Sequence, residues 1–204
     1  MRVLLVRSGQ AVLDRGNVFP PMNLAGLGSV LRKAGHTVSV LDQLVQHTTR
    51  EELLRRIGET TPDVVGFTSM TYDIQSVNED ISLLKRRHPE VVTVLGGTHV
   101  TSLAESTLGE NPDIDLAVVG EGERVVERLF EALAEHRSFE GINGVAWRKD
   151  GAVVVNPPEE FIDDIDAIPF PEYDLLDIDQ YRYLQRNWDH RRFMSILTSR
   201  GCPF

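Results

Sequence analysis

Two patterns of apolar positions alternate along the first 140 residues. Short runs of consecutive apolar residues are typical of strands buried in a parallel sheet. Between them lie longer segments whose apolar residues recur every three or four positions, which predicts helices with one buried face. The runs that predict strands are residues 2–7, 37–41, 64–68, 91–95 and 116–119, and the segments that predict helices are residues 22–34, 49–57, 74–84, 100–108 and 125–133.

Strand and helix units in regular succession predict an α/β fold. Right-handed crossovers between the strands place helices on both faces of the sheet. We therefore expect a doubly wound, five-stranded parallel sheet of flavodoxin-like or Rossmann-like type in residues 1–140. Residues 145–148 and 152–155 then flank an Asp-Gly pair at 150–151, which favours a β-hairpin. We place this hairpin, residues 141–157, at the edge of the domain.

The charge of the chain changes after the hairpin. The whole chain of 204 residues has a formal net charge of −10. Residues 158–180 contain nine acidic residues and no lysine or arginine, whereas five arginines and one aspartate follow between residue 181 and the end. We interpret residues 158–192 as an acidic linker and solvated connector, and residues 193–204 as the start of another domain.

Composition argues against several classes of protein. With 41% hydrophobic and 25% charged residues, the chain has the composition of a globular protein. It contains neither the roughly 18 consecutive apolar residues that a membrane helix needs nor a signal peptide. The acidic charge argues against a nucleic-acid or membrane partner, so we expect a cytoplasmic protein. The single cysteine, Cys202, forms no disulfide within the chain and does not complete a thiolate metal site alone.

Four loops of the predicted fold meet at one edge of the sheet. Ligands of open parallel sheets bind outside the carboxyl ends of the strands. In this chain those ends are followed by residues 8–21, 69–71, 96–99 and 120–123. Two of these loops are rich in glycine, which lets the main chain approach a ligand closely. This edge suits a large, flat or extended ligand better than a small metabolite.

Three common nucleotide and phosphate sites are not supported by the sequence. A dinucleotide fingerprint needs glycines directly after the first strand, but the partial match at Gly26 and Gly28 lies inside the first helix and has Leu31 at the third position. A P-loop needs a Gly-Lys pair, and the chain has none. A phosphoreceiver domain needs an acceptor aspartate at the end of the third strand, where Thr68 and Ser69 stand instead.

Several stretches of sequence together resemble a known family. They are Pro20-Pro21, Leu31-Arg32-Lys33-Ala34-Gly35-His36, residues 64–71, 95–101 and 120–123, Ile168-Pro169-Phe170-Pro171-Glu172-Tyr173-Asp174, and the chain end Thr198-Ser199-Arg200-Gly201-Cys202-Pro203-Phe204. In this order they resemble the amino-terminal half of cobalamin-dependent radical S-adenosylmethionine enzymes. The resemblance covers essentially the whole chain. It implies a cobalamin-binding domain in residues 1–140 and the first strand of a radical domain in residues 193–204.

The end of the chain implies an iron–sulfur cluster in the intact protein. In the family, Ser-Arg-Gly-Cys-Pro-Phe opens a C-x3-C-x2-C motif whose three thiolates hold a 4Fe-4S cluster, and the remaining iron binds S-adenosylmethionine. By resemblance, Cys202 is the first of these ligands and the other two lie beyond Phe204. We therefore expect a truncated chain that cannot assemble the cluster or perform the radical chemistry by itself.

The resemblance also implies a cobalamin bound base-off, without a histidine ligand to cobalt. Many cobalamin-binding folds use a D-x-H-x-x-G motif, but none of the six histidines here has an aspartate two residues before it. Ser69 and Thr71 could instead cap a helix, His99 could pack or cap, and Glu121 could be a favourable first-turn charge. The expected cofactor-binding residues are Pro21, Thr68, Ser69, Met70, Thr71, Gly96, Gly97, Thr98, His99, Gly120, Glu121 and Gly122.

The function implied for the intact protein is methylation of an unactivated carbon through methylcobalamin, with this chain binding and presenting the cofactor. Members of the family also form rings without methyl transfer. Two alternatives stay open: a stand-alone corrinoid carrier or sensor, and a degenerate domain that binds nothing and serves as an interface for the barrel. The small-molecule substrate is not readable from this part of the sequence.

Overall fold

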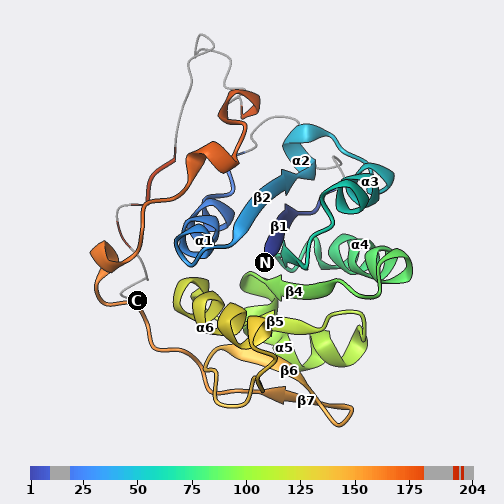
Figure 1. Cartoon of the computed structure of the whole chain (residues 1–204), viewed down its shortest axis with the longest axis vertical. Coiled ribbons are helices and arrows are strands. Elements are labelled where there is room, and N and C mark those ends of the chain that lie inside the picture. Colours follow the sequence, from blue (N-terminus) through green and yellow to red (C-terminus); the bar gives the residue numbers. More distant parts are fainter. Residues whose placement is uncertain (10–18, 182–194, 198, 200–204) are drawn as a thin grey trace.

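The computed structural model describes residues 1–9, 19–181, 195–197 and 199. In this part of the chain a seven-stranded sheet has the order β2-β1-β3-β4-β5-β6-β7 (Figure 1). The strands from β1 to β5 are parallel, and β6 and β7 are antiparallel additions at the edge next to β5. The strands are β1 (Arg2–Arg7), β2 (Thr37–Asp42), β3 (Val64–Thr68), β4 (Val92–Gly96), β5 (Leu116–Val118), β6 (Val145–Lys149) and β7 (Ala152–Val155).

Helices cover both faces of the sheet and bury their apolar stripes against it. One face packs against α3, α4 and α5, which contribute residues such as Leu53, Ile81 and Leu108 to one core. The other packs against α1 and α6, which contribute Leu24 and Leu129 to a second core. The helices are α1 (Met22–Lys33), α2 (Gln43–Gln46), α3 (Arg50–Thr60), α4 (Ile74–Arg87), α5 (Thr98–Glu110) and α6 (Gly122–Ala134), with short 3-10 turns at η1 (Ile165–Ala167), η2 (Tyr173–Leu175) and η3 (Ile178–Gln180).

The predicted fold class is confirmed. The five parallel strands and the doubly wound arrangement agree with the hydrophobic pattern, and β6 and β7 form the expected edge hairpin. The turn of this hairpin has positive φ at both Asp150 and Gly151, 50° and 83°, which is the backbone that an Asp-Gly pair favours. The parallel sheet with its antiparallel hairpin is therefore a single mixed sheet.

The acidic segment after the hairpin contacts the domain, whereas the sequence predicts a solvated connector. Residues 158–181, called the strap below, run back along α6 and α1 (orange to red in Figure 1). The backbone N–H of Glu172 donates to Ala25 O at 3.1 Å, and Arg32 on α1 donates to Asp174 Oδ2 at 2.7 Å. Leu176 and Tyr181 are buried. Ile162 of the strap is buried as well, whereas Phe161 and Phe170 are exposed.

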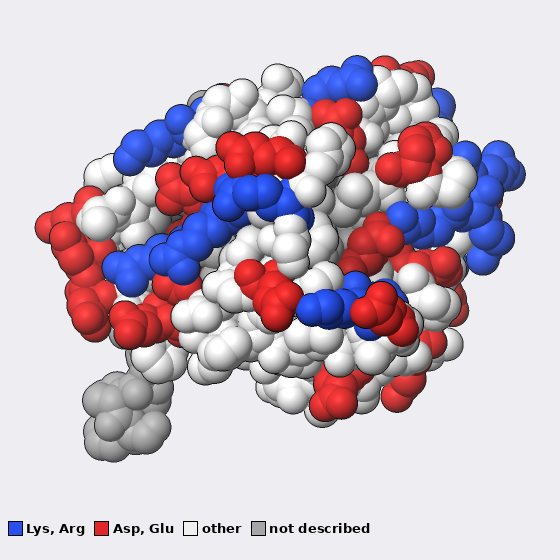
Figure 2. All heavy atoms as spheres, turned by 60° about the horizontal axis from the view of Figure 1, so that its bottom comes forward, with Lys and Arg blue, Asp and Glu red and all other residues white. Residues whose placement is uncertain are grey.

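Acidic and basic side chains are interspersed on the face that Figure 2 shows. Ion pairs join neighbouring elements of the described structure, such as Arg128 on α6 with Glu159 of the strap at 2.8 Å. A nucleic acid would require a continuous basic surface. This face does not provide one.

Candidate functional site

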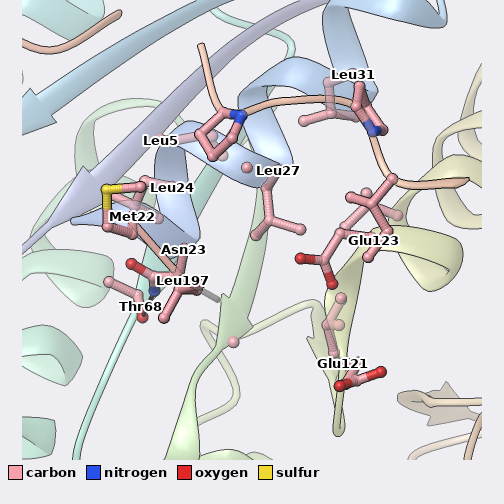
Figure 3. A pocket seen from close by; sticks show the side chains of 18 of the residues that line it. Leu5, Met22, Asn23, Leu24, Leu27, Leu31, Thr68, Glu121, Glu123 and Leu197 are labelled. Atoms are coloured by element: carbon pink, nitrogen blue, oxygen red, sulfur yellow. Dashed lines mark hydrogen bonds between the residues drawn. The ribbon is translucent and has the colours of Figure 1, made fainter. Parts of the chain in front are cut away.

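A pocket of about 840 Å³ lies between the sheet and the helix pair α1 and α6 (Figure 3). It extends from the carboxyl ends of the parallel strands, at Thr68, Gly96 and Gly120, down to the middle of β1 and β4, at Leu5 and Val94. This is the edge at which open α/β sheets bind ligands. The volume falls within the range of small-molecule sites.

The deep part of the pocket is apolar. Leu24, Leu27 and Leu31 of α1 line it together with Val126 and Phe130 of α6. An apolar wall of this extent binds a flat aromatic group well because contact with it removes apolar surface from water.

Glycine residues on β3 and at the start of α6 keep this pocket open. Gly66 lies on β3 in the floor, and a Cβ at this position would lie 3.0 Å from Leu5 Cδ2. Gly122 begins α6, and a Cβ there would lie 2.9 Å from Leu27 Cδ2. Side chains at these two positions would therefore crowd residues that line the pocket.

Polar groups gather at the rim. Asn23 Nδ2 donates to Thr68 Oγ1 at 3.0 Å, which joins the start of α1 to the end of β3. Glu121 accepts a hydrogen bond from the backbone N–H of Ile162 at 3.0 Å, which joins the loop after β5 to the strap. Glu123 follows within the first turn of α6 and is buried. The rim thus offers amide, hydroxyl and carboxylate groups above an apolar interior.

The loops after β3 and β4 hold each other through their backbones. Ser69 N donates to Gly96 O at 2.9 Å, and His99 N donates to Ser69 O at 3.4 Å. Gly97 has φ of +105°, and a Cβ there would lie only 2.3 Å from Ser69 O. The glycine at 97 is therefore required for this close approach of two main chains.

Both ring nitrogens of His99 lie within hydrogen-bond distance of threonine hydroxyls. Its ring is buried, with Nδ1 at 3.3 Å from Thr71 Oγ1 and Nε2 at 3.2 Å from Thr107 Oγ1. Beside it, Asp73 accepts a hydrogen bond from Met70 N at 2.7 Å, and burial raises the pKa of the Asp73 carboxyl. These contacts give His99 the packing arrangement that the sequence left open as an alternative to cofactor contact.

The structure brings half of the expected cofactor-binding residues into the pocket lining. These are Thr68, Gly96, Gly97, Gly120, Glu121 and Gly122. The other six stand near the same edge of the sheet but outside the lining, at the start of α1, in the loop after β3 and in the first turn of α5; they are Pro21, Ser69, Met70, Thr71, Thr98 and His99. Cys202 lies outside the described residues.

Sequence reasoning missed the parts of the pocket that come from helices and from the strap. The sequence pattern assigns Asn23 and Leu27 only to a helix and the strap residues Ile168 and Tyr173 only to a linker, whereas all four line the pocket. Small residues inside α1 were the available signal, because glycines within a helix mark close approach of another group. A Cβ at Gly28 would lie 2.3 Å from Leu175 Cδ1 of the strap.

Neither a metal cluster nor a membrane helix is found in the described structure. Within residues 1–9, 19–181, 195–197 and 199, no three His, Cys, Asp or Glu side chains are grouped so that they could hold a metal ion. None of the described helices is both long enough and apolar enough to cross a membrane.

Comparison with known proteins identifies relatives over the whole chain. The chain is 36% identical over 207 residues to an uncharacterized methyltransferase of Pyrococcus horikoshii, covering 100% of this chain and 44% of that protein. It is 35% identical over 213 residues to the anaerobic magnesium-protoporphyrin IX monomethyl ester cyclase of Rubrivivax gelatinosus, covering 100% of this chain and 37% of that protein. The chain thus spans less than half the length of these relatives.

A solved structure supports the fold. The radical S-adenosylmethionine methyltransferase TsrM from Kitasatospora setae, with cobalamin and a 4Fe-4S cluster bound, matches with a TM-score of 0.67 and 23% identity over 78% of this chain and 31% of that one. At 23% identity the match shows similarity of fold alone.

The family itself is established by the sequence match. The family described as B12 binding domain matches residues 11–130, which is more than half of the chain and includes most of the loops that line the pocket. The chain therefore belongs to the B12-binding domain family and is related to the cobalamin-dependent radical S-adenosylmethionine enzymes.

Proposed function

We propose that this chain binds cobalamin in the pocket between the sheet and helices α1 and α6, and that it presents the cofactor to the active site of a longer radical S-adenosylmethionine enzyme. The observation that carries the proposal is the apolar pocket of about 840 Å³, which opens at a glycine-lined edge in a chain of the B12-binding family. When bound, cobalamin supplies a cobalt centre that can carry a methyl group.

The residues of the pocket fit the two chemically different parts of this cofactor. The apolar walls of α1 and α6 suit the aromatic base at the end of the nucleotide tail, which needs a dry and flat cavity. The loops at Gly96, Gly97 and Gly120 leave room for the bulkier, amide-bearing parts at the edge of the sheet. Asn23 and Thr68 offer hydrogen bonds between these two regions.

We further propose that cobalt receives no imidazole ligand from His99. Both ring nitrogens of His99 lie within hydrogen-bond distance of threonine hydroxyls, and the side chain does not line the pocket. In this arrangement His99 orients the loop that carries Thr71, and the cofactor is bound base-off. In the longer protein, Cys202 would be the first thiolate of the 4Fe-4S cluster.

For the longer protein we propose methyl transfer to an unactivated carbon. The similarity to the Pyrococcus horikoshii methyltransferase supports this choice. Ring formation is the second candidate, favoured by the 35% identity to the Rubrivivax gelatinosus cyclase. A stand-alone corrinoid carrier and an interface domain that binds nothing are the remaining alternatives, and the second of these predicts no cobalamin uptake.

The test is an anaerobic titration of the chain with hydroxocobalamin, followed by gel filtration and a visible spectrum. Stoichiometric corrinoid with a base-off spectrum is the expected result. Gly66→Val should weaken binding at least about tenfold, because its side chain would press on Leu5 and fill the floor of the pocket. Gly58→Val is the matched control, since a Cβ at this position of α3 meets nothing within 4 Å. Equal affinities of the two variants, or a failure of the unaltered chain to retain corrinoid, would refute the proposal.

A further inference from the structure

The strap is first fastened beside α6, one of the two helices that border the pocket. Arg128 of α6 pairs with Glu159 at 2.8 Å. The backbone N–H of Ile162 donates to the carboxylate of Glu121, the residue just before α6, at 3.0 Å. The side chain of Ile162 is buried. These contacts fix the path of the strap as it passes α6.

The strap is fastened a second time on α1, the other helix that borders the pocket (Figure 1). The backbone N–H of Glu172 donates to Ala25 O at 3.1 Å. Arg32 pairs with Asp174 at 2.7 Å and with Glu172 at 3.3 Å. Residues 163–171, called the bridge below, therefore lie between two fastened points, one beside each helix.

The bridge borders the pocket with mainly apolar side chains. Ile165, Ile168, Pro169 and Phe170 line the pocket, and Asp166 is the charged residue among its lining side chains. Phe170 is 91% exposed and Ile165 is 43% exposed, although both border a cavity. Exposed apolar surface beside a cavity is typical of a site at which a ligand completes the packing.

This wall suits one part of cobalamin better than the other. The corrin ring carries amide side chains, which need hydrogen-bond partners, whereas the base of the nucleotide tail is a flat aromatic ring. Asn23 and Thr68 offer polar groups at the rim of the pocket, while the bridge offers mainly apolar contact. The bridge therefore suits the aromatic base of the tail.

We propose that the bridge closes over the nucleotide tail of cobalamin, and that the contacts of the strap with α6 and α1 hold the bridge in place and so retain the cofactor. The inference rests on the proposed function of cobalamin binding. A tail that touches both the helices and the bridge binds a fastened strap more tightly than a loose one. Cofactor binding and fastening of the strap therefore stabilise each other.

Hydrogen exchange followed by mass spectrometry tests the contact in the unaltered chain. Amide exchange in residues 163–171 should slow at least about fivefold when methylcobalamin is bound. With cobinamide, which lacks the nucleotide and its base, exchange of the bridge should keep the rate of the free protein. Helix α3 packs on the other face of the sheet and serves as the internal reference.

A double variant tests the role of the fastening contacts. Arg32→Met with Arg128→Met removes the ion pairs of the strap with both helices. We expect the dissociation rate of methylcobalamin to rise at least about fivefold, since two partly exposed pairs are lost. The dissociation rate of cobinamide should stay unchanged. Rapid dilution of each complex, with separation of the released corrinoid over time, measures both rates.

The matched control removes two arginines that pair within or next to their own helix. Arg55 pairs with Glu52 of α3, and Arg137 pairs with Glu135 at the end of α6. The double variant Arg55→Met with Arg137→Met loses the same charge as the test variant. It should release methylcobalamin at the rate of the unaltered chain.

The other outcomes overturn the inference and separate it from the proposed function. If cobalamin binds while exchange of the bridge does not change, or if cobinamide slows it equally, the bridge does not cover the tail, and cobalamin binding itself stands. Equal release rates from the two double variants, or faster release of cobinamide from the test variant, would show that the strap does not retain the tail. If neither corrinoid binds to the unaltered chain, the proposed function fails and the inference fails with it.

Discussion

Gly97 is the residue whose replacement the backbone tolerates least in the site. Its φ of +105° is unfavourable for any residue with a Cβ, and that Cβ would overlap Ser69 O. The atom it would meet belongs to the main chain and cannot rotate away. The contact between the loops after β3 and β4 therefore depends on glycine at this position.

We expect Gly97→Ala to lower the free energy of unfolding by about 2 kcal/mol or more. Urea denaturation measures this change, and a corrinoid titration should show weaker binding because the loops must separate. In the control Gly109→Ala, the new Cβ meets nothing within 4 Å on the exposed side of α5. That variant should keep its stability or gain up to about 1 kcal/mol. Similar losses in both variants would contradict the argument.

At the scale of elements, Arg148 fastens the edge hairpin to a helix. This residue of β6 donates to Ile114 O at 2.5 Å and Asn111 O at 2.8 Å, and it also bonds Leu108 O. These carbonyls lie at and just beyond the carboxyl end of α5, where a cation is favourable. The antiparallel strands thus stabilise one of the helices that cover the parallel sheet.

We expect Arg148→Met to destabilise the fold by about 1–3 kcal/mol, because several carbonyl groups lose a charged donor. The neighbouring Lys149 pairs with the exposed Glu140 at 2.8 Å. Lys149→Met should change stability by less than about 1 kcal/mol, as surface ion pairs do. Thermal or urea unfolding compares the two variants, and a larger effect at Lys149 would show that the hairpin is held in another way.

At the scale of the whole molecule, the strap closes one side of the pocket and ends at a buried polar cluster. The Tyr181 hydroxyl donates to Asp42 Oδ2 at 2.7 Å, and Arg7 donates to the same carboxylate through Nε at 2.9 Å. The end of the strap is thereby joined to the carboxyl ends of β1 and β2. Burial and the negative charge of Asp42 raise the pKa of Tyr181 above its usual range.

The raised pKa of Tyr181 makes stability depend on alkaline pH. Above about pH 10 the tyrosine of the unfolded chain loses its proton while the folded chain keeps it. The unfolded state then binds fewer protons, so the free energy of unfolding falls as pH rises. We expect Tyr181→Phe to cost about 1 kcal/mol at neutral pH and to remove this part of the alkaline slope. Urea denaturation of both proteins over this range measures it, and an identical slope in the variant would contradict the assignment.

The sequence by itself determined the fold class and the edge of the sheet at which the pocket opens. Half of the cofactor-binding residues expected from the sequence line this pocket. Continuous apolar runs mark strands buried on both faces, apolar stripes mark the helices, and the Asp-Gly pair marks the hairpin, because each of these signals depends on the environment of a few neighbouring residues. The same local reasoning located the glycine loops after β4 and β5. The carboxyl ends of parallel strands necessarily meet at one edge.

Only the tertiary structure decided what those elements do to one another. The charge of the strap suggested a solvated connector, yet its Asp174 pairs with Arg32 of α1, which lies 142 residues away in sequence. The pocket exists because α1 and α6 face each other, and the directions of His99 and Glu123 depend on neighbours from other elements. Such contacts bring together residues that are distant along the chain. Local periodicity and local charge therefore do not predict these contacts.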